Sequence, residues 1–557
     1  MSSSSDLLIA SDQRARSLSR GSFSSSRNSS RNNSPRESLD VPFSAPLSQP
    51  LLLTEERERQ ETKDGRTLTD EQTFAFSLGH AQNDLSSSLW FTYLLIYLET
   101  LRYLPPSSSG ICMLSGQIFD AISTPIAGLV SDSGLGVKWR TWNLCPRTYQ
   151  HLIGTFLVTT FFSCVWIFPP PEFNEGTSPT TYKPLTTSYY SLSAGLFNVG
   201  WAWVQVNHLA LIPDLTDHEL ERVTLTSKRY GVTVLTSVLA FLSYLILLSE
   251  FEPKGYNSEE KWRVLGIICV SVGMVCNVIF YRGMSSVCAS KNSGIRGGDS
   301  LKCLSDELYN EALLPPSGLP SKDDVSIQVP SSTPDETITS PFQWLKTPLF
   351  YPTALIYMST RLLINIINVY ITFYLLEHLQ SPSVTLALVP LTMYVSSFIL
   401  TSFSKRITKK FGKTITYIIG GGITGLGCVG CFFLKGSGFE DIGMYIIAVF
   451  FGVGNSLVMV TGVGKVNDLV GDNVSTSAFV YGCMSFTDKL SSGVVVLYIQ
   501  NVRDTKCDDE EGDEDECGRF VKDVMTWVPI VSVGVACAVI VALGDKQKQK
   551  EKKQING

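Results

Sequence analysis

The stretch GQIFDAISTPIAGLVSD at residues 116–132 places Asp120 inside a segment that is otherwise apolar enough to cross a membrane. A second stretch, GHAQNDLSSSLWFTYLLIYLE at residues 79–99, does the same with Asp84. A bare carboxylate at the centre of a bilayer costs about 2.5–3.5 kcal/mol on insertion scales. An ionisable residue within a membrane segment therefore indicates an ion or substrate pathway. The two aspartates favour a transporter before any family is considered.

The composition points to a membrane protein rather than a soluble one. Of 557 residues, 44% are hydrophobic and 17% are charged, whereas soluble domains carry about 25% charged residues. The formal net charge is −6 and we find no basic groove-binding module, so no nucleic-acid partner is expected. The sequence shows no nucleophile–base triad, phosphate-binding loop or redox-cofactor motif. We therefore expect neither an enzyme nor a bound cofactor.

Twelve apolar segments follow the polar N-terminal region, and a membrane-spanning helix needs roughly 20 residues. The segments lie at about 74–100, 108–131, 149–169, 188–213, 223–249, 262–282, 347–377, 382–403, 414–435, 441–463, 475–500 and 521–544. The sequence therefore predicts an all-α membrane protein that crosses the lipid bilayer twelve times. We expect it to be a monomer.

Polar segments divide the chain into two groups of six helices. Residues 1–73 are rich in serine and arginine, and residues 283–346 are rich in serine, proline and aspartate, which is typical of disorder. The predicted organisation is a disordered tail at 1–73, six-helix halves at 74–282 and 347–544, a disordered central loop at 283–346 and a basic tail at 545–557. Similar strings at 91–95 (FTYLL) and 371–375 (ITFYL) favour two pseudo-repeats.

The distribution of lysine and arginine predicts the orientation of the chain. Basic residues gather at 138–147, at 405–413 and at 546–553, which all lie on one side if the chain crosses twelve times. That side is cytoplasmic by the positive-inside rule, and both termini and the central loop lie there too. Arg503 and Lys506, in the last loop of the opposite side, are the main exception.

Polar residues recur at the three- and four-residue spacing that places them on one face of a helix. Such faces in the first, second, fourth, seventh and eleventh helices indicate a central hydrated cavity, although packing contacts between helices are the alternative. Asp488 and Lys489 do not face each other on a helix, so each is expected to pair with another helix. Candidates for the substrate or proton pathway are His80, Asp84, Asp120, Thr124, Gln205, His208, Arg361, Asn365 and Asp488.

These residue types suit the transport of a small polar organic solute. A carboxylate in a low dielectric binds a proton more readily and a nearby cation reverses this, so Asp84 and Asp120 can carry a proton or meet a substrate ammonium. His80 and His208 can titrate between cytosolic and acidic-lumen pH. The five fixed donors of Arg361 suit a substrate carboxylate or phosphate. We therefore expect that these residues allow transport to be coupled to protons.

The cysteines do not form the disulfide framework of a secreted domain, because most of the 13 lie in apolar runs. Cys428 and Cys431 are spaced like half of a zinc site with no second pair nearby, so no metal is expected. Cys507 and Cys517 flank an acidic loop on the predicted non-cytoplasmic side. An oxidising lumen would allow a disulfide between them.

Four strings carry a family resemblance: residues 79–99 and 116–132, HLALIPDLTDHELERVTLTSKRY at 208–230 and DLVGDNVSTSAFVYGCMSFTDK at 468–489. They resemble the glycoside–pentoside–hexuronide cation symporter branch of the major facilitator superfamily, over about residues 74–544. The resemblance implies a major facilitator fold with a substrate site between the halves near the midplane.

The resemblance also bears on the coupling ion. In that branch, acids in helices one, two and four bind the cation, and Asp84 and Asp120 match two of these positions. Thr124 and Gln205 stand where the branch has two further acids. This departure argues against a dedicated sodium site and leaves proton coupling, or no coupling.

Within the branch, the strings are most similar to a lysosomal and melanosomal member linked to cysteine import and pigmentation. The resemblance implies alternating-access import of cysteine into lysosomes or melanosomes, with the plasma membrane as the alternative location. Two other functions stay open. One is a proton-coupled sugar or lysolipid symporter, and the other is a non-transporting membrane scaffold or sensor that acts through the tail and central loop.

Overall fold

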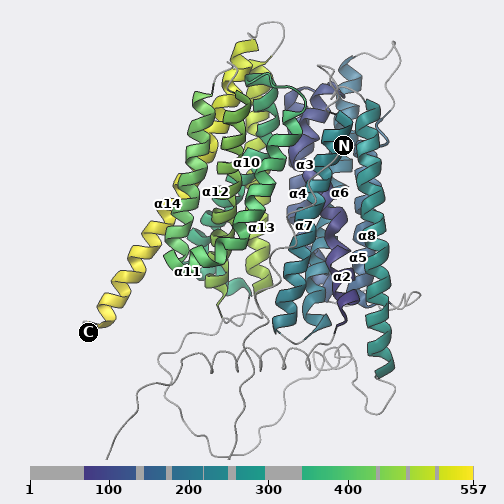
Figure 1. Cartoon of the computed structure of the whole chain (residues 1–557), viewed down its shortest axis with the longest axis vertical. Coiled ribbons are helices and arrows are strands. Elements are labelled where there is room, and N and C mark those ends of the chain that lie inside the picture. The colour runs from purple at the N-terminus through teal and green to yellow at the C-terminus, as the bar shows by residue number, and fades with distance from the viewer. Residues whose placement is uncertain are drawn as a thin grey trace, which may run out of the picture. The chain divides into compact units, whose positions relative to one another are not determined.

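The computed structural model describes residues 68–132, 144–170, 179–216, 219–248, 259–294, 341–434, 440–471, 477–507 and 514–555. The regular structure in these residues is helical, and it contains the twelve long helices that the sequence predicts. Figure 1 shows them as two groups, coloured purple to teal and green to yellow. The groups are the two six-helix halves.

The described residues of the first half contain eight helical elements, of which α3 to α8 are the six long ones. Its bounds are α2 Asp70–Ser77, η1 Leu78–His80, α3 Ala81–Thr100, α4 Pro106–Asp132, α5 Pro146–Trp166, α6 Pro179–Leu215, α7 Glu219–Leu248 and α8 Glu259–Gly294. The second half begins with a short 3-10 helix and includes one turn of π-helix, η4. Its bounds are η3 Pro341–Lys346, α10 Phe350–Phe373, η4 Tyr374–His378, α11 Thr385–Phe433, α12 Glu440–Val470, α13 Ser477–Lys506 and α14 Glu514–Ile555.

The element α11 is two membrane helices joined without a loop. Gly412 has φ +79° and ψ 161°, a conformation that residues with a side chain rarely adopt. The chain changes direction at Gly412, which follows the apolar stretch Thr385–Ser404 and lies near the start of the next stretch, Arg406–Phe433. Counting α11 as two gives six long helices in the second half.

Eight helical stretches of the described residues are long and apolar enough to cross a membrane by length and composition alone. Of the twelve long helices, α3, α5, α6 and α13 are the less apolar ones. In α3 the polar residues Gln82, Asn83 and Asp84 are buried among protein neighbours, as is Asp488 of α13. Polar side chains are tolerated in a membrane helix when they face the protein interior. Two of the helices with buried acids, α3 and α13, are therefore among the less apolar ones.

The predicted N-terminal tail is wrong over its last residues, because an ordered helix begins at Asp70. The Thr69 hydroxyl accepts a hydrogen bond from the Gln72 amide (3.2 Å), and the Gln72 side chain accepts one from the Thr69 amide (3.0 Å). This reciprocal capping box begins α2. Leu68 is buried in a cluster with Phe76 of the same helix. Residues 1–67 of the predicted tail lie outside the described residues.

Helices also extend into the predicted central loop and the basic tail. Within the predicted loop at 283–346, α8 continues to Gly294 and η3 occupies Pro341–Lys346. Residues 295–340 lie outside the described residues. At the other end, α14 continues beyond residue 544 to Ile555. A helix that leaves the bilayer takes on the polar composition of a loop, so apolarity alone places its end too early.

Aromatic side chains hold α3 within the first half. Tyr93 stacks on Tyr244 of α7 with ring centroids 4.2 Å apart. Tyr97, one turn further along α3, packs on Trp166 of α5 at 4.7 Å and on Trp262 of α8 at 5.6 Å. All of these rings are buried. The polar N-terminal part of α3 is thus anchored by its aromatic C-terminal part.

A glycine contact repeats in the two halves. In α5 and α6, a Cβ on Gly200 would lie 3.0 Å from the carbonyl oxygen of Gly154 and 2.7 Å from a backbone nitrogen of α5. In the second part of α11 and in α12, a Cβ on Gly420 would lie 3.1 Å from the carbonyl oxygen of Gly454. Both helix pairs therefore approach to backbone contact, as small residues allow in membranes. The pairs are the third and fourth helices of each half, which agrees with the predicted pseudo-repeat.

Two disulfides are present in the described residues. The structure joins Cys507 at the end of α13 to Cys517 in α14, with Cα atoms 5.1 Å apart. It also joins Cys145, before α5, to Cys288 of α8, which are 143 residues apart in the sequence. The second bond was not predicted, because sequence distance gives no sign of this contact.

The glycine contact in the second half generates a stability prediction. Gly454→Ala should lower the melting temperature of the purified protein, since its Cβ would lie 2.7 Å from the Thr424 amide nitrogen and 2.8 Å from the Gly420 carbonyl oxygen. Overpacking of this kind costs about 1–3 kcal/mol. Gly425→Ala is the matched control, because a Cβ there meets nothing within 4 Å. Equal melting temperatures for the two variants would contradict the prediction.

Candidate functional site

Asp84 lies in the first turn of α3 and is the acceptor of a buried polar cluster in the first half. Its Oδ1 contacts Nδ1 of His80 at 2.9 Å, and its Oδ2 accepts a hydrogen bond from the Thr233 hydroxyl of α7 at 2.8 Å. Arg229, one turn before Thr233, interacts electrostatically with the same carboxylate. The charge of Asp84 is therefore satisfied by groups from η1 and α7.

Asp120 of α4 forms an ion pair with Lys489 of α13, which joins the two halves. The Thr124 hydroxyl lies 3.2 Å from Oδ1 of Asp120 and accepts a hydrogen bond from Nζ of Lys489 at 3.1 Å. The Lys489 side chain is 14% exposed. A lysine in this position neutralises the carboxylate while its own side chain stays slightly exposed.

Arg361 of α10 and Asp488 of α13 form the third charged group. Nε of Arg361 donates to Oδ2 of Asp488 at 2.9 Å. Asn365 donates to Oδ1 of Asp488 at 3.3 Å and to the Ser492 hydroxyl at 2.9 Å. Arg361 is 27% exposed, whereas Asp488 is 4% exposed. The buried carboxylate therefore orients an arginine that remains partly open on its other edge. Asp488 and Lys489 each pair with another helix, as predicted.

Electrostatic interactions connect the three groups across the boundary between the halves. Arg361 interacts with Asp120 as well as with Asp488. Tyr394 of α11 interacts with both Arg361 and Asp84. The candidate site thus brings together the charged residues that the sequence marked in helices one, two, seven and eleven, and its carboxylates and basic groups balance. The balanced set is Asp84, Asp120 and Asp488 with Arg229, Arg361 and Lys489.

Two candidates on the fourth helix are placed differently from each other. Gln205 is exposed, whereas His208 is fully buried in the first half. His208 stacks on Phe76 of α2 at 4.4 Å, and its Nε2 donates to the Phe76 carbonyl oxygen at 2.9 Å. Its ring centroid is 5.9 Å from that of His80. His208 therefore packs beside the buried His80 and Asp84 cluster, whereas Gln205 is exposed.

Sequence reasoning missed several residues that complete the site. Thr233 and Arg229 of α7 were not among the candidates, nor were Tyr394, Ser492 or the pairing of Lys489 with Asp120. One signal was available for Arg229, because an arginine beside an apolar segment needs a counter-charge. The hydroxyl groups carried no such signal, since threonine and serine are common in membrane helices.

The Cys507–Cys517 disulfide bears on whether one cluster of side chains could bind a metal ion. Glu377, Cys507 and Cys517 lie close enough together to hold a metal ion. The two sulfur atoms are bonded to each other, and a metal ligand would have to be a free thiolate. This group is therefore part of a structural link and does not serve as a metal site in the oxidised chain.

Two six-helix halves whose buried charges pair across their boundary define a class, the multi-pass membrane transport proteins. A family model described as Major Facilitator Superfamily matches residues 76–494. The chain belongs to that family. It is therefore a membrane transporter for a small-molecule substrate and not an enzyme.

Relatives with the same architecture cover most of the chain. It is 31% identical over 493 residues to the horse protein named major facilitator superfamily domain-containing protein 12, covering 86% of this chain and 93% of that one. The human protein of the same name is 30% identical over 484 residues, covering 84% and 91%. A solved structure of a nucleoside transporter NupG variant superposes with a TM-score of 0.55 at 11% identity, covering 84% of this chain and all of that one. This last likeness concerns the fold alone.

The ion pair between the halves generates a prediction about stability. Lys489→Met should destabilise the protein by about 3 kcal/mol, because it leaves Asp120 buried without its cation. The double variant Lys489→Met with Asp120→Asn should regain much of that loss, since neither charge remains. Thermal unfolding of the purified variants measures both effects.

The control for this pair lies at the protein surface. Lys413 and Asp468 form an ion pair whose side chains are largely exposed. Lys413→Met should change the melting temperature little, because exposed pairs contribute about 0–1 kcal/mol. A Lys489→Met variant as stable as Lys413→Met would contradict the assigned pairing energy.

Proposed function

We propose that the chain is a secondary transporter of a small zwitterionic solute, and that the solute is cysteine imported into lysosomes or melanosomes. The observation that carries the proposal is the charge balance of the candidate site, with three carboxylates and three basic groups. A free amino acid carries one ammonium and one carboxylate. A balanced site can bind such a solute without leaving an uncompensated charge in the membrane interior.

Each end of an amino acid has a suitable partner. Arg361 keeps part of its side chain exposed while Asp488, which Asn365 also contacts, holds its Nε, so a substrate carboxylate could bind the remaining guanidinium donors. Asp84 is the partner that we assign to the substrate ammonium. Tyr394 interacts with both of these charges and would lie along the backbone of the bound solute.

The Asp120–Lys489 pair suits a role in alternating access. It joins α4 of one half to α13 of the other, so rocking of the halves around the site must strain or exchange it. Thr124 bonds both partners and can hold either one when the other moves away. Gln205, which stands where the resembling branch has an acid, would contact the solute as a neutral group.

His80, which is held against Asp84, is the residue that we assign to the coupling proton. A histidine held against a carboxylate can pick up a proton without leaving an isolated positive charge. His208, whose ring is 5.9 Å away, would tune this pair. Because a proton symporter in an acidic organelle would export its solute, import requires antiport, facilitated flow or oxidation of cysteine in the lumen.

The location rests on relatives and on charge distribution. The horse and human relatives, which are 31% and 30% identical to this chain, carry the same name, and the resemblance stated above implies a lysosomal or melanosomal location for that group. The basic stretch Arg406–Lys413 follows the eighth helix and would face the cytoplasm, with both chain termini on the same side.

The decisive experiment measures substrate-screened flux in vesicles that contain the purified full chain. Labelled cysteine, a hexose and a lysolipid are supplied in turn, with and without an imposed pH gradient. Saturable uptake of cysteine supports the proposal. Uptake of the hexose or the lysolipid without cysteine would assign the site to the competing solute instead.

Asp120→Asn should reduce cysteine flux at least about tenfold while the protein still reaches its membrane, because the inter-half pair loses its charge. Flux and membrane abundance are measured together. Asp468→Asn, in an exposed pair of the second half, is the control and should transport normally. Unchanged and still pH-dependent flux in Asp120→Asn would count against the assigned role.

A deletion separates transport from scaffolding. Removing residues 1–67 leaves every described helix in place, so vesicles with the shortened chain should take up cysteine at the normal rate. A scaffold or sensor that acts through the tail would lose its function with that deletion. Abolished flux in correctly inserted, shortened protein would therefore contradict a tail-independent carrier.

A further inference from the structure

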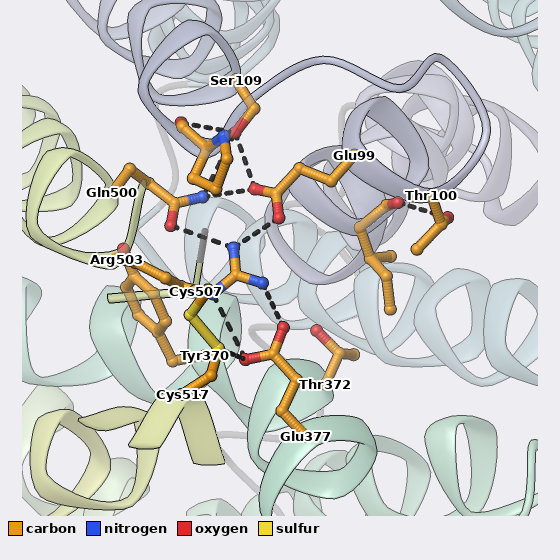
Figure 2. Close-up of polar contacts among 12 residues, drawn as sticks. Glu99, Thr100, Ser109, Tyr370, Thr372, Glu377, Gln500, Arg503, Cys507 and Cys517 are labelled. Atoms are coloured by element: carbon orange, nitrogen blue, oxygen red, sulfur yellow. Dashed lines mark hydrogen bonds and ion pairs between the residues drawn. A yellow bond between two sulfur atoms is a disulfide. The ribbon is translucent and has the colours of Figure 1, made fainter. Parts of the chain in front are cut away.

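A second charged cluster lies at the opposite end of the bundle from the basic stretch Arg406–Lys413, where α3 ends and α4 begins. Arg503 of α13 forms ion pairs with Glu99 of α3 and Glu377 of η4 (Figure 2). The Arg503 side chain is 6% exposed and that of Glu99 10%. The ring of Phe373 covers the guanidinium at 4.2 Å. One nearly buried cation thus pairs with two carboxylates, so the cluster has one more acid than base.

The cluster fastens the two halves together at this end. Glu99 and Ser109 belong to the first half, whereas Gln500, Arg503 and Glu377 belong to the second. Nε2 of Gln500 donates to Oε1 of Glu99 at 2.7 Å and to the Ser109 hydroxyl at 3.2 Å. The bonds that cross the boundary therefore converge on Glu99 and its neighbour, as Figure 2 shows.

The two glutamates would fare differently if this end opened. Glu377 is in the same half as Arg503, and α14 is packed against it: the Cys517 sulfur lies 3.3 Å from Oε2 of Glu377, and the disulfide ties α14 to α13. Arg503 would keep Glu377 after the halves part. Of its three partners in the described cluster, Glu99 would lose Arg503 and Gln500 and keep the Ser109 hydroxyl, which donates to it at 2.7 Å.

Other charged and titratable groups near the cluster have partners of their own. Arg102 pairs with Glu259 of α8 at 3.5 Å, and Lys506 pairs with Glu516 of α14 at 2.7 Å. Their neighbours are also engaged: Arg519 interacts with Glu516, His378 contacts the Leu434 carbonyl oxygen, and Tyr370 donates to the Val496 carbonyl oxygen. Within the described residues of this end, Glu99 is the carboxylate whose cation lies in the other half.

We propose that Glu99 is a proton-binding gate residue, and that protonation from the compartment facing this end favours opening toward it. A carboxylate binds a proton more readily once its cation is withdrawn, so proton binding and opening support each other by linkage. Glu377 keeps its cation in either state, so opening does not withdraw the charge that pairs with it. The inference rests on the alternating-access function proposed above and adds a proton site remote from Asp84.

Hydrogen exchange of the full chain in lipid nanodiscs, without substrate, tests the proposal. Exchange is followed in peptides covering 92–104 and 496–507 at pH about 7.5 and about 5, after correction for intrinsic exchange rates. The wild-type protein should open more at the lower pH. Glu99→Gln removes the charge without changing the shape, and it should raise exchange about tenfold at the higher pH and abolish the pH response.

Glu377→Gln is the matched control, because it is the same substitution on the other carboxylate of the same arginine. It should keep the pH response, since Glu99 is intact. Gln500→Ala, which removes an inter-half hydrogen bond without altering charge, should raise exchange and also keep the response. A Glu99→Gln protein with wild-type pH dependence, or loss of the response in both glutamate variants, would overturn the proposal.

The readout does not depend on the identity of the solute. If cysteine is not transported but Glu99→Gln abolishes the pH response, the gate stands and the substrate assignment fails. If cysteine is transported but Glu99→Gln leaves the exchange of both peptides unchanged, the gate fails and the substrate assignment stands.

Discussion

Ionised groups within a bilayer must find their counter-charges in the protein, because lipid offers neither hydrogen bonds nor a high dielectric constant. In this chain that constraint is met partly within each half and partly between helices of different halves. Lys489 neutralises Asp120 across the boundary, and Arg503 neutralises Glu99 in the same way. The relative position of the halves is therefore set by charge as well as by packing. Any movement between them has to exchange these partners, which makes the same residues responsible for both closure and release.

Much of the fold could be predicted from the sequence, because membrane helices are marked by length and apolarity. The less apolar helices, such as α3 and α13, were still recognisable from polar residues at helical spacing. Helix ends were the weak point. The capping box at Thr69 begins α2 inside the predicted tail, and α8 runs on to Gly294 inside the predicted loop. Outside the bilayer a helix no longer needs apolar residues, so composition ceases to distinguish it from a loop.

Four charged members of the candidate site, Asp84, Asp120, Arg361 and Asp488, were marked by the sequence because the cost of an ionised group in lipid depends on the residue alone, whereas Arg229 was not marked. Their partners could not be predicted, since pairing depends on how separate helices are placed. Asp488 orients Arg361, although the two are distant in sequence. Arg503 is a clearer case, as it stood out as an exception to the positive-inside rule. Its two glutamate partners, Glu99 and Glu377, lie in separate helices and could not be paired with it from the sequence.

The glycine contacts determine how displacement passes through each half. Where Gly154 meets Gly200, and where Gly420 meets Gly454, two helices touch along their backbones with no side chain to yield between them. Such a helix pair moves as one rigid body, and its two helices do not slide past each other. When such a helix pair tilts in the bilayer, separation of the halves at one membrane surface is accompanied by their approach at the other. The glycines, which have no side chain, thereby link the movements of the halves at the two membrane surfaces.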